Sequence, residues 1–141
     1  MSWRPEVFGH PLENKFKFMK NTLVLRQIGK FYNALDDDCY ILFYLFGYKI
    51  SNYKSGFPVS ALNKVKNELE EKKISFILKD KTGVKEFDFK RKNKYLFYLE
   101  KGKEKYKKFE RNRKIEEYVN FFSEEKIDKI YKYIESLIDE E

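Results

Sequence analysis

Leu23-Val24-Leu25-Arg26-Gln27-Ile28 is the stretch on which the fold depends, and Gly29 follows it directly. Its branched apolar residues are typical of a β-strand, and a glycine is a common end of one. Further along, Asp36-Asp37-Asp38 precedes an apolar run up to Phe46, the pattern of a helix whose N-terminus is capped by carboxylates. We therefore expect a strand over 23–28 and a helix over about 37–46 that ends at Gly47.

Downstream of Gly47, short apolar stretches flank one amphipathic stretch. Apolar residues at positions 61, 62, 65 and 69 recur at helical spacing, and Pro58 suits the first turn of such a helix, where an N–H is not needed. Residues 84–89 mix apolar and polar side chains and alternate from Glu86 to Phe89, which is typical of a half-buried strand. The expected elements are a short strand at 48–50, a polar loop at 52–56, a helix at about 59–73, a strand at 74–78 and a strand at 84–89.

The last third of the chain has a helical pattern. Residues 95–99 fit either a strand or a helix, the stretch from Gly102 to about Asn120 fits a helix, and Ser123 is a good N-cap for a final helix. Strands alternate with helices in the first 90 residues. We expect an α/β fold with a mixed β-sheet flanked by helices over 1–90, and a basic, aromatic segment with C-terminal helices over 91–141 packed on it.

The charge of the chain is unevenly distributed. Its net charge is +7, yet residues 85–114 hold 13 Lys and Arg against five Asp and Glu, whereas residues 115–141 hold three against nine. A basic block permits binding to a polyanion such as nucleic acid. No apolar run reaches the length of a membrane span, and the single cysteine, Cys39, lies in an apolar run. We expect a cytoplasmic protein with no membrane partner.

Arg26-Gln27-Ile28-Gly29-Lys30-Phe31-Tyr32-Asn33 resembles the segment of MutS-type mismatch-repair proteins that ends in Gly-x-Phe-Tyr-Glu. Two further features follow in the same order. Asp36-Asp37-Asp38-Cys39 stands where that family has an acidic pair opening a helix, and Ser55-Gly56-Phe57-Pro58 is similar to the family's Gly-x-Pro turn. The likeness covers roughly residues 22–82 and is to the N-terminal, mismatch-sensing domain of the family.

In that family the phenylalanine of the motif wedges into the minor groove and stacks on the mispaired base, and the glutamate hydrogen-bonds to that base. By match, the resemblance implies that Phe31 is the wedge. Asn33 stands in place of the glutamate, and its amide can both donate and accept a hydrogen bond but has no charge. The implied function is a non-catalytic module that binds distorted or mismatched duplex DNA as an accessory factor and lacks the ATPase.

The basic block adds candidate contacts to phosphates and bases, because cations alternate with aromatic side chains from Lys90 to Tyr98. A solvated face over core aromatics would give the same pattern. Phe31 likewise fits a core aromatic at a strand end, and Asn33 fits a turn residue. The candidate nucleic-acid-binding residues are Phe31, Asn33, Lys30, Lys54, Lys90, Arg91, Lys92 and Lys94.

Enzymatic activity is not expected. His10 is the only histidine, and it lies between Gly9 and Pro11, so a catalytic Ser/His/Asp or Cys/His site has no other base to use. The three consecutive aspartates at 36–38 favour helix capping over metal binding, because adjacent residues of a helix start point in different directions. The sequence contains neither a glycine-rich phosphate loop nor a Cys/His metal pair. We predict no cofactor and no metal.

Two other functions fit the same residues. Asn33 and the acidic tail are compatible with a protein-binding adaptor that regulates a larger nucleoprotein complex, of the phage or mobile-element type, without reading mismatches. The Lys and aromatic block is also compatible with RNA binding, although the resemblance favours DNA.

Overall fold

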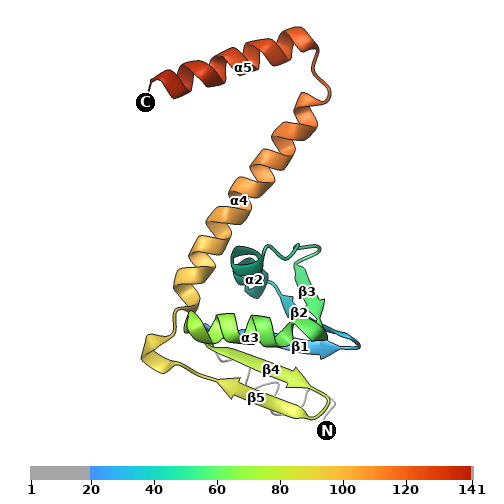
Figure 1. The fold of residues 1–141 in the computed structure, drawn as a ribbon, viewed down its shortest axis with the longest axis vertical. Coiled ribbons are helices and arrows are strands. Elements are labelled where there is room, and N and C mark those ends of the chain that lie inside the picture. The colour runs from blue at the N-terminus through green and yellow to red at the C-terminus, as the bar shows by residue number, and fades with distance from the viewer. Residues whose placement is uncertain (1–19, 141) are drawn as a thin grey trace. The chain divides into compact units, whose positions relative to one another are not determined.

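A mixed five-stranded β-sheet forms the centre of the first part of the chain in the computed structural model, which describes residues 20–140 (Figure 1). The strands lie in the order β3-β2-β1-β4-β5. Strand β1 pairs in parallel with β4, and every other pair is antiparallel. The strands are β1 (Leu23–Ile28), β2 (Phe31–Leu35), β3 (Lys54–Pro58), β4 (Phe76–Asp80) and β5 (Gly83–Phe87); the helices are α2 (Asp38–Phe46), α3 (Leu62–Glu71), α4 (Tyr95–Val119) and α5 (Glu124–Asp139), with short 3-10 turns η1 (Val59–Ala61) and η2 (Lys90–Lys92).

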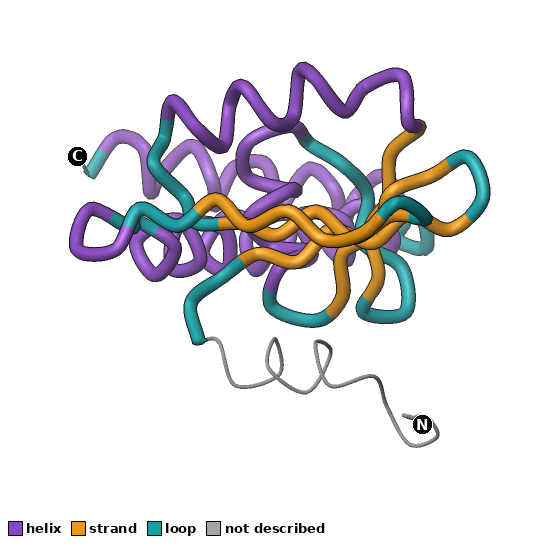
Figure 2. Tube along the Cα trace, turned by 90° about the horizontal axis from the view of Figure 1, so that it is seen from below, coloured by secondary structure: helices purple, strands orange, loops and turns teal. Residues whose placement is uncertain are grey.

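One face of the sheet is covered by helices, and the core lies between the two layers. Figure 2 shows the strands nearly edge-on with a helix running along one side of them. Alternate strand residues such as Leu23, Leu25 and Tyr32 point into this core, as the period of two along a strand requires. Helices α2 and α3 and the first turns of α4 supply the other side of the core, with Ile41, Leu42, Val65, Leu69, Tyr95 and Leu99.

Most of the predicted elements are confirmed. Strand β1 has the predicted bounds, and helix α2 ends at Gly47 with φ 73°. Residues 95–99, which fitted either a strand or a helix, belong to helix α4. Strand β4 is an internal strand, as its continuous apolar run indicated. Ser123 caps α5 by accepting a hydrogen bond from the backbone N–H of Lys126 at 3.3 Å. The fold is α/β with a mixed sheet, as expected.

Two predictions between Gly47 and Pro58 are wrong. Residues 48–50 are not a strand; the ring of Tyr48 instead stacks on Phe46 and on Phe57, with ring centroids 5.1 and 5.6 Å apart. The predicted polar loop at 52–56 is half strand, because β3 begins at Lys54 and pairs with β2. Pro58 ends this strand, which is possible because β3 is at the edge of the sheet. It is also the N-cap of the 3-10 turn η1, which leads directly into α3, so it stands at a helix start close to the predicted place.

The aspartates before α2 do not cap it with their side chains, contrary to the prediction. Asp37 is at the N-cap position but makes no side-chain cap hydrogen bond. Asp38, one residue later, accepts a hydrogen bond from the backbone N–H of Val24 at 3.0 Å and from the hydroxyl of Tyr95 at 2.6 Å. Its carboxylate therefore connects the start of α2 to strand β1 and to helix α4.

Gly102 allows helix α4 to approach α2 closely. Residue 102 is buried, and a Cβ added there would overlap the backbone carbonyl of Tyr40, which cannot rotate away as a side chain would. We predict that Gly102→Ala destabilises the protein by about 1–2 kcal/mol, because overpacking outweighs the better helix propensity of alanine. Chemical denaturation followed by circular dichroism measures this. Glu104→Ala, at an exposed position of the same helix, is the matched control; equal stability of the two variants would contradict the close approach.

The chain divides into two compact units, one up to Lys103 and the other from Glu104 onward. Tyr95, Leu99 and Gly102 are buried, so the first turns of α4 belong with the sheet and the division falls later than residue 90. The second unit contains the rest of α4 and the whole of α5. None of the helices within residues 20–140 combines the length and the apolar composition that crossing a membrane requires.

Candidate nucleic-acid interface

The predicted wedge lies on the second face of the sheet, away from the helices. Gly29 and Lys30 form a two-residue hairpin turn between β1 and β2, and Gly29 has φ 63°, a value that suits glycine at the first position of a type II′ turn. Phe31 is the first residue after this turn and pairs with Ile28 on β1 and with Pro58 on β3. These three residues form one apolar row across the three strands.

Phe31 is exposed, so the alternative of a core aromatic is excluded. Its relative exposure is 52%, and that of Ile28 is 60%, whereas Tyr32, the next residue along β2, is 3% exposed and belongs to the core. The alternation arises because neighbouring strand residues point to opposite faces. Phe31 and Asn33, two residues apart, therefore share the second face. We call the two rows Ile28, Phe31 and Pro58, and Arg26, Asn33 and Gly56, together the Phe31 face.

Asn33 is a strand residue and not a turn residue, and its side chain lies over Gly56. The two residues are register partners on β2 and β3, and a Cβ added at Gly56 would be 2.7 Å from the Asn33 side-chain oxygen. The glycine therefore leaves the space that the amide occupies. A side chain at position 56 would displace the amide from this place beside Phe31.

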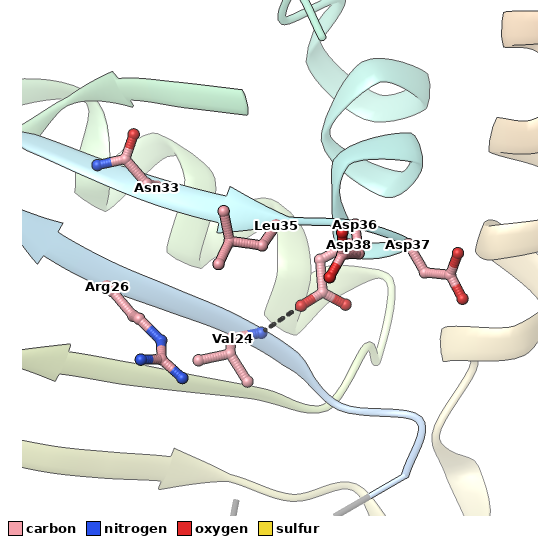
Figure 3. Close-up of a pocket in the computed structure, with 7 residues that line it drawn as sticks. All are labelled: Val24, Arg26, Asn33, Leu35, Asp36, Asp37 and Asp38. Atoms are coloured by element: carbon pink, nitrogen blue, oxygen red, sulfur yellow. Dashed lines mark hydrogen bonds between the residues drawn. The ribbon is translucent and has the colours of Figure 1, made fainter. Parts of the chain in front are cut away.

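A shallow pocket extends from Asn33 toward the start of α2 (Figure 3). Arg26 and Asn33 line one end of it, while the carboxylate of Asp38 turns toward the backbone of Val24 and Asp37 points away from it (Figure 3). The pocket is lined by Val24, Arg26, Asn33, Leu35, Asp36, Asp37 and Asp38. Its polar character changes along its length, from a cation and an amide near Phe31 to carboxylates at the far end of β2.

The charge nearest to Phe31 is positive. Lys30 precedes it in the exposed turn, and Arg26 is in the next row. Arg26 also has Lys79 on β4 as its register partner, and burial lowers the pKa of that lysine. The carboxylates of 36–38 begin after the end of β2, roughly 13 Å along the strand from Phe31 at about 3.3 Å per residue. A polyanion approaching Phe31 therefore meets cations first.

The remaining predicted residues lie elsewhere. Lys54 is exposed and pairs with Leu35, at the opposite end of β2 from Phe31. Lys90, Arg91 and Lys92 form the exposed turn η2, and the adjoining Asn93 donates to the backbone carbonyl of Asn21 at 2.7 Å, just before β1 begins. Lys94 is exposed next to it.

This arrangement separates the predicted residues into two groups. The cations of residues 90–94 are near the start of β1 and Phe31 is just beyond its end, a separation of roughly 17 Å for five steps of about 3.3 Å along the strand. The structure brings together Phe31, Asn33 and Lys30, and it does not bring the block at 90–94 to them.

Four residues of the Phe31 face are not among the predicted site residues. Arg26 and Ile28 share a face with Val24 by simple alternation along β1, so the sequence contains a signal for them. Gly56 and Pro58 belong to β3, which the sequence analysis did not predict as a strand. Their pairing with β2 is a tertiary contact with no local signal.

Two observations concern metal binding and the cysteine thiol. Between residues 20 and 140, no three His, Cys, Asp or Glu side chains gather in a way that could hold a metal ion. Cys39 is buried, and burial raises the pKa of its thiol to about 12, which leaves almost no thiolate at neutral pH. His10 lies outside the described residues.

The chain matches neither a protein-family model nor a curated protein. The Phe31 face is therefore the main source of evidence about function.

Proposed function

We propose that the protein is a non-catalytic nucleic-acid-binding module that uses Phe31 as a wedge at distorted or mismatched duplex DNA, in the manner of the MutS N-terminal domain. The observation that supports this most is the exposed Phe31 ring on the same sheet face as Asn33, directly after the tight Gly29-Lys30 turn. A rigid sheet holds both side chains, which suits a group that must enter between stacked bases.

The energetics of wedging explain a preference for distorted sites. Inserting an aromatic ring between base pairs costs unstacking energy, and this cost is lower where a base is mispaired or the step is flexible. The ring then recovers about 1–3 kcal/mol by stacking on a base. Ile28 and Pro58 flank Phe31 in the same row and give the wedge an apolar base.

Asn33 supplies the polar contact in this proposal. Its amide can donate to one base atom and accept from another, which suits bases in several pairings. Because the amide lacks charge, we expect its contribution to be smaller than that of a carboxylate accepting from a base. The proposal is therefore a binder of distorted duplexes with a weaker choice between mismatches than a glutamate would give.

The decisive experiment measures binding of the full chain to homoduplex, mismatched and looped DNA of equal length over a series of salt concentrations. Tighter binding to the distorted duplexes supports the proposal. Absence of binding at about 50 mM salt, where phosphate contacts are strong, would overturn it. Competition with RNA of the same sequence distinguishes DNA binding from RNA binding.

The cations at 90–92 are predicted to contribute affinity without selectivity. The triple variant Lys90→Gln/Arg91→Gln/Lys92→Gln should weaken binding to all duplexes equally and reduce the slope of log K against log salt by up to about 3. Lys81→Gln/Lys129→Gln/Lys132→Gln removes the same charge from exposed positions elsewhere and is the control. Equal salt slopes for the two triple variants would remove η2 from the interface.

A protein-binding adaptor is the second candidate, and the apolar character of the row Ile28, Phe31 and Pro58 favours it, since exposed apolar rows also suit protein contacts. In that case the chain should capture one stoichiometric partner from its native host, and capture should survive nuclease treatment. Capture that is lost on nuclease treatment supports the nucleic-acid proposal instead.

A further inference from the structure

Helix α5, in the second unit, has an apolar stripe in which no residue is fully buried. Ile127, Ile130, Ile134 and Leu137 follow each other at spacings of three, four and three, the a and d positions of a heptad repeat. None of the residues of α5 is buried, and Ile134 and Leu137 are 48% and 43% exposed. Such a stripe is typical of a helix that packs against another helix.

An antiparallel copy of α5 fits this stripe in a single register. When two α5 helices pair head to tail, Ile127 of one packs opposite Leu137 of the other, and Ile130 packs opposite Ile134. The two-fold axis repeats both layers, so all four apolar positions of each helix are used. Tyr131 then meets its own counterpart at the edge of the seam.

The charges beside the seam favour this antiparallel arrangement. In the same register, Lys126 lies opposite Glu140 of the other helix, and symmetry creates this pair twice. In a parallel pair, Lys126 would face Tyr131 and Glu140 would face no cation. Antiparallel pairing also places the dipoles of the two helices in opposite directions, which is favourable.

We propose that α5 is a homodimerisation helix that pairs antiparallel with α5 of a second copy of this chain. The seam contains two Ile127–Leu137 layers and two Ile130–Ile134 layers, so the interface is at the small end of the range of specific interfaces. The dimer should therefore be in equilibrium with monomer at micromolar concentrations. This inference does not depend on nucleic-acid binding.

The test is the mass of the full chain in solution, measured by sedimentation over a wide range of concentrations. We expect the mass to rise from 17.2 kDa to twice that value. Ile134→Asp should raise the dimer dissociation constant at least tenfold, whereas Lys132→Glu, on the outward face of the same helix, should change it little. A chain that stays monomeric throughout, or a dimer that tolerates Ile134→Asp, would overturn the proposal.

Charge reversal tests the orientation without disturbing the apolar stripe. Glu140→Lys should weaken the dimer severalfold by placing Lys opposite Lys126, and adding Lys126→Glu should restore it. Because Lys126 Nζ also lies 4.8 Å from the Phe122 ring centroid, Glu140→Lys is the cleaner single variant. A dimer that shows no such restoration is not paired in the antiparallel register.

Discussion

Phe31→Ala should abolish most of the preference of the protein for mismatched over matched duplex DNA. Removing the ring removes the stacking that compensates for unstacking the duplex, a loss of about 1–3 kcal/mol, or roughly 5- to 150-fold in affinity for the distorted site. Binding to matched duplex should weaken less, because phosphate contacts are retained. Fluorescence anisotropy with matched and mismatched duplexes at one salt concentration gives both affinities.

The salt dependence separates a wedge from a general surface contact. Phe31 has no charge, so Phe31→Ala should leave the slope of log K against log salt unchanged while the mismatch preference falls. Phe121→Ala is the control, since Phe121 is 88% exposed and belongs to the second unit. If both phenylalanine variants lower the preference equally, the Phe31 face is not the wedge. The Phe31 ring lies outside the core, so Phe31→Ala should remain folded. A lower mismatch preference in this variant is therefore not caused by unfolding.

The elements with local signals were predictable from the sequence. Strand β1 has a branched apolar run, α3 has helical spacing, and α5 has both a serine cap and an apolar stripe. Strands β2 and β3 lack such signals, because Asn33 and Gly56 are residues that favour turns. They are strands because a tight hairpin places β2 against β1, and β3 then completes the pairing at the edge.

The same limit applies to the candidate site. Phe31, Asn33 and Lys30 were identified because the resemblance and the Gly29 turn are contiguous in the sequence. The distance from residues 90–94 to Phe31 was not predictable, because it depends on where the turn η2 meets the start of β1. The role of Asp38 was also hidden, since its partners are 14 and 57 residues away along the chain.

Asp38 should make the stability of the protein fall as the pH rises from about 4 to about 6. Burial is the largest cause that raises the pKa of this carboxyl from its ordinary value of 3.8 to about 6, against the lowering effect of the hydrogen bonds from Tyr95 and Val24. Between these two values the folded state binds more protons than the unfolded state, so folding is favoured at the acidic end and loses stability as Asp38 ionises. A shift of this size corresponds to about 2–3 kcal/mol.

Asp38→Asn removes this titration while keeping an oxygen that accepts a hydrogen bond and an amide that donates to the Tyr95 hydroxyl. Its stability relative to the wild-type chain should therefore increase by about 2 kcal/mol between pH 4 and pH 7, measured by urea denaturation at each pH. Tyr95→Phe takes away a hydrogen bond that lowers the pKa of Asp38, so in that variant the stability loss should occur at higher pH. Tyr98→Phe removes a hydroxyl of the same helix that is not the one bonded to Asp38, and its profile should match the wild type. A constant difference between Asp38→Asn and the wild type across this range would mean that the carboxylate joining β1, α2 and α4 is as well solvated in the folded protein as in the unfolded chain.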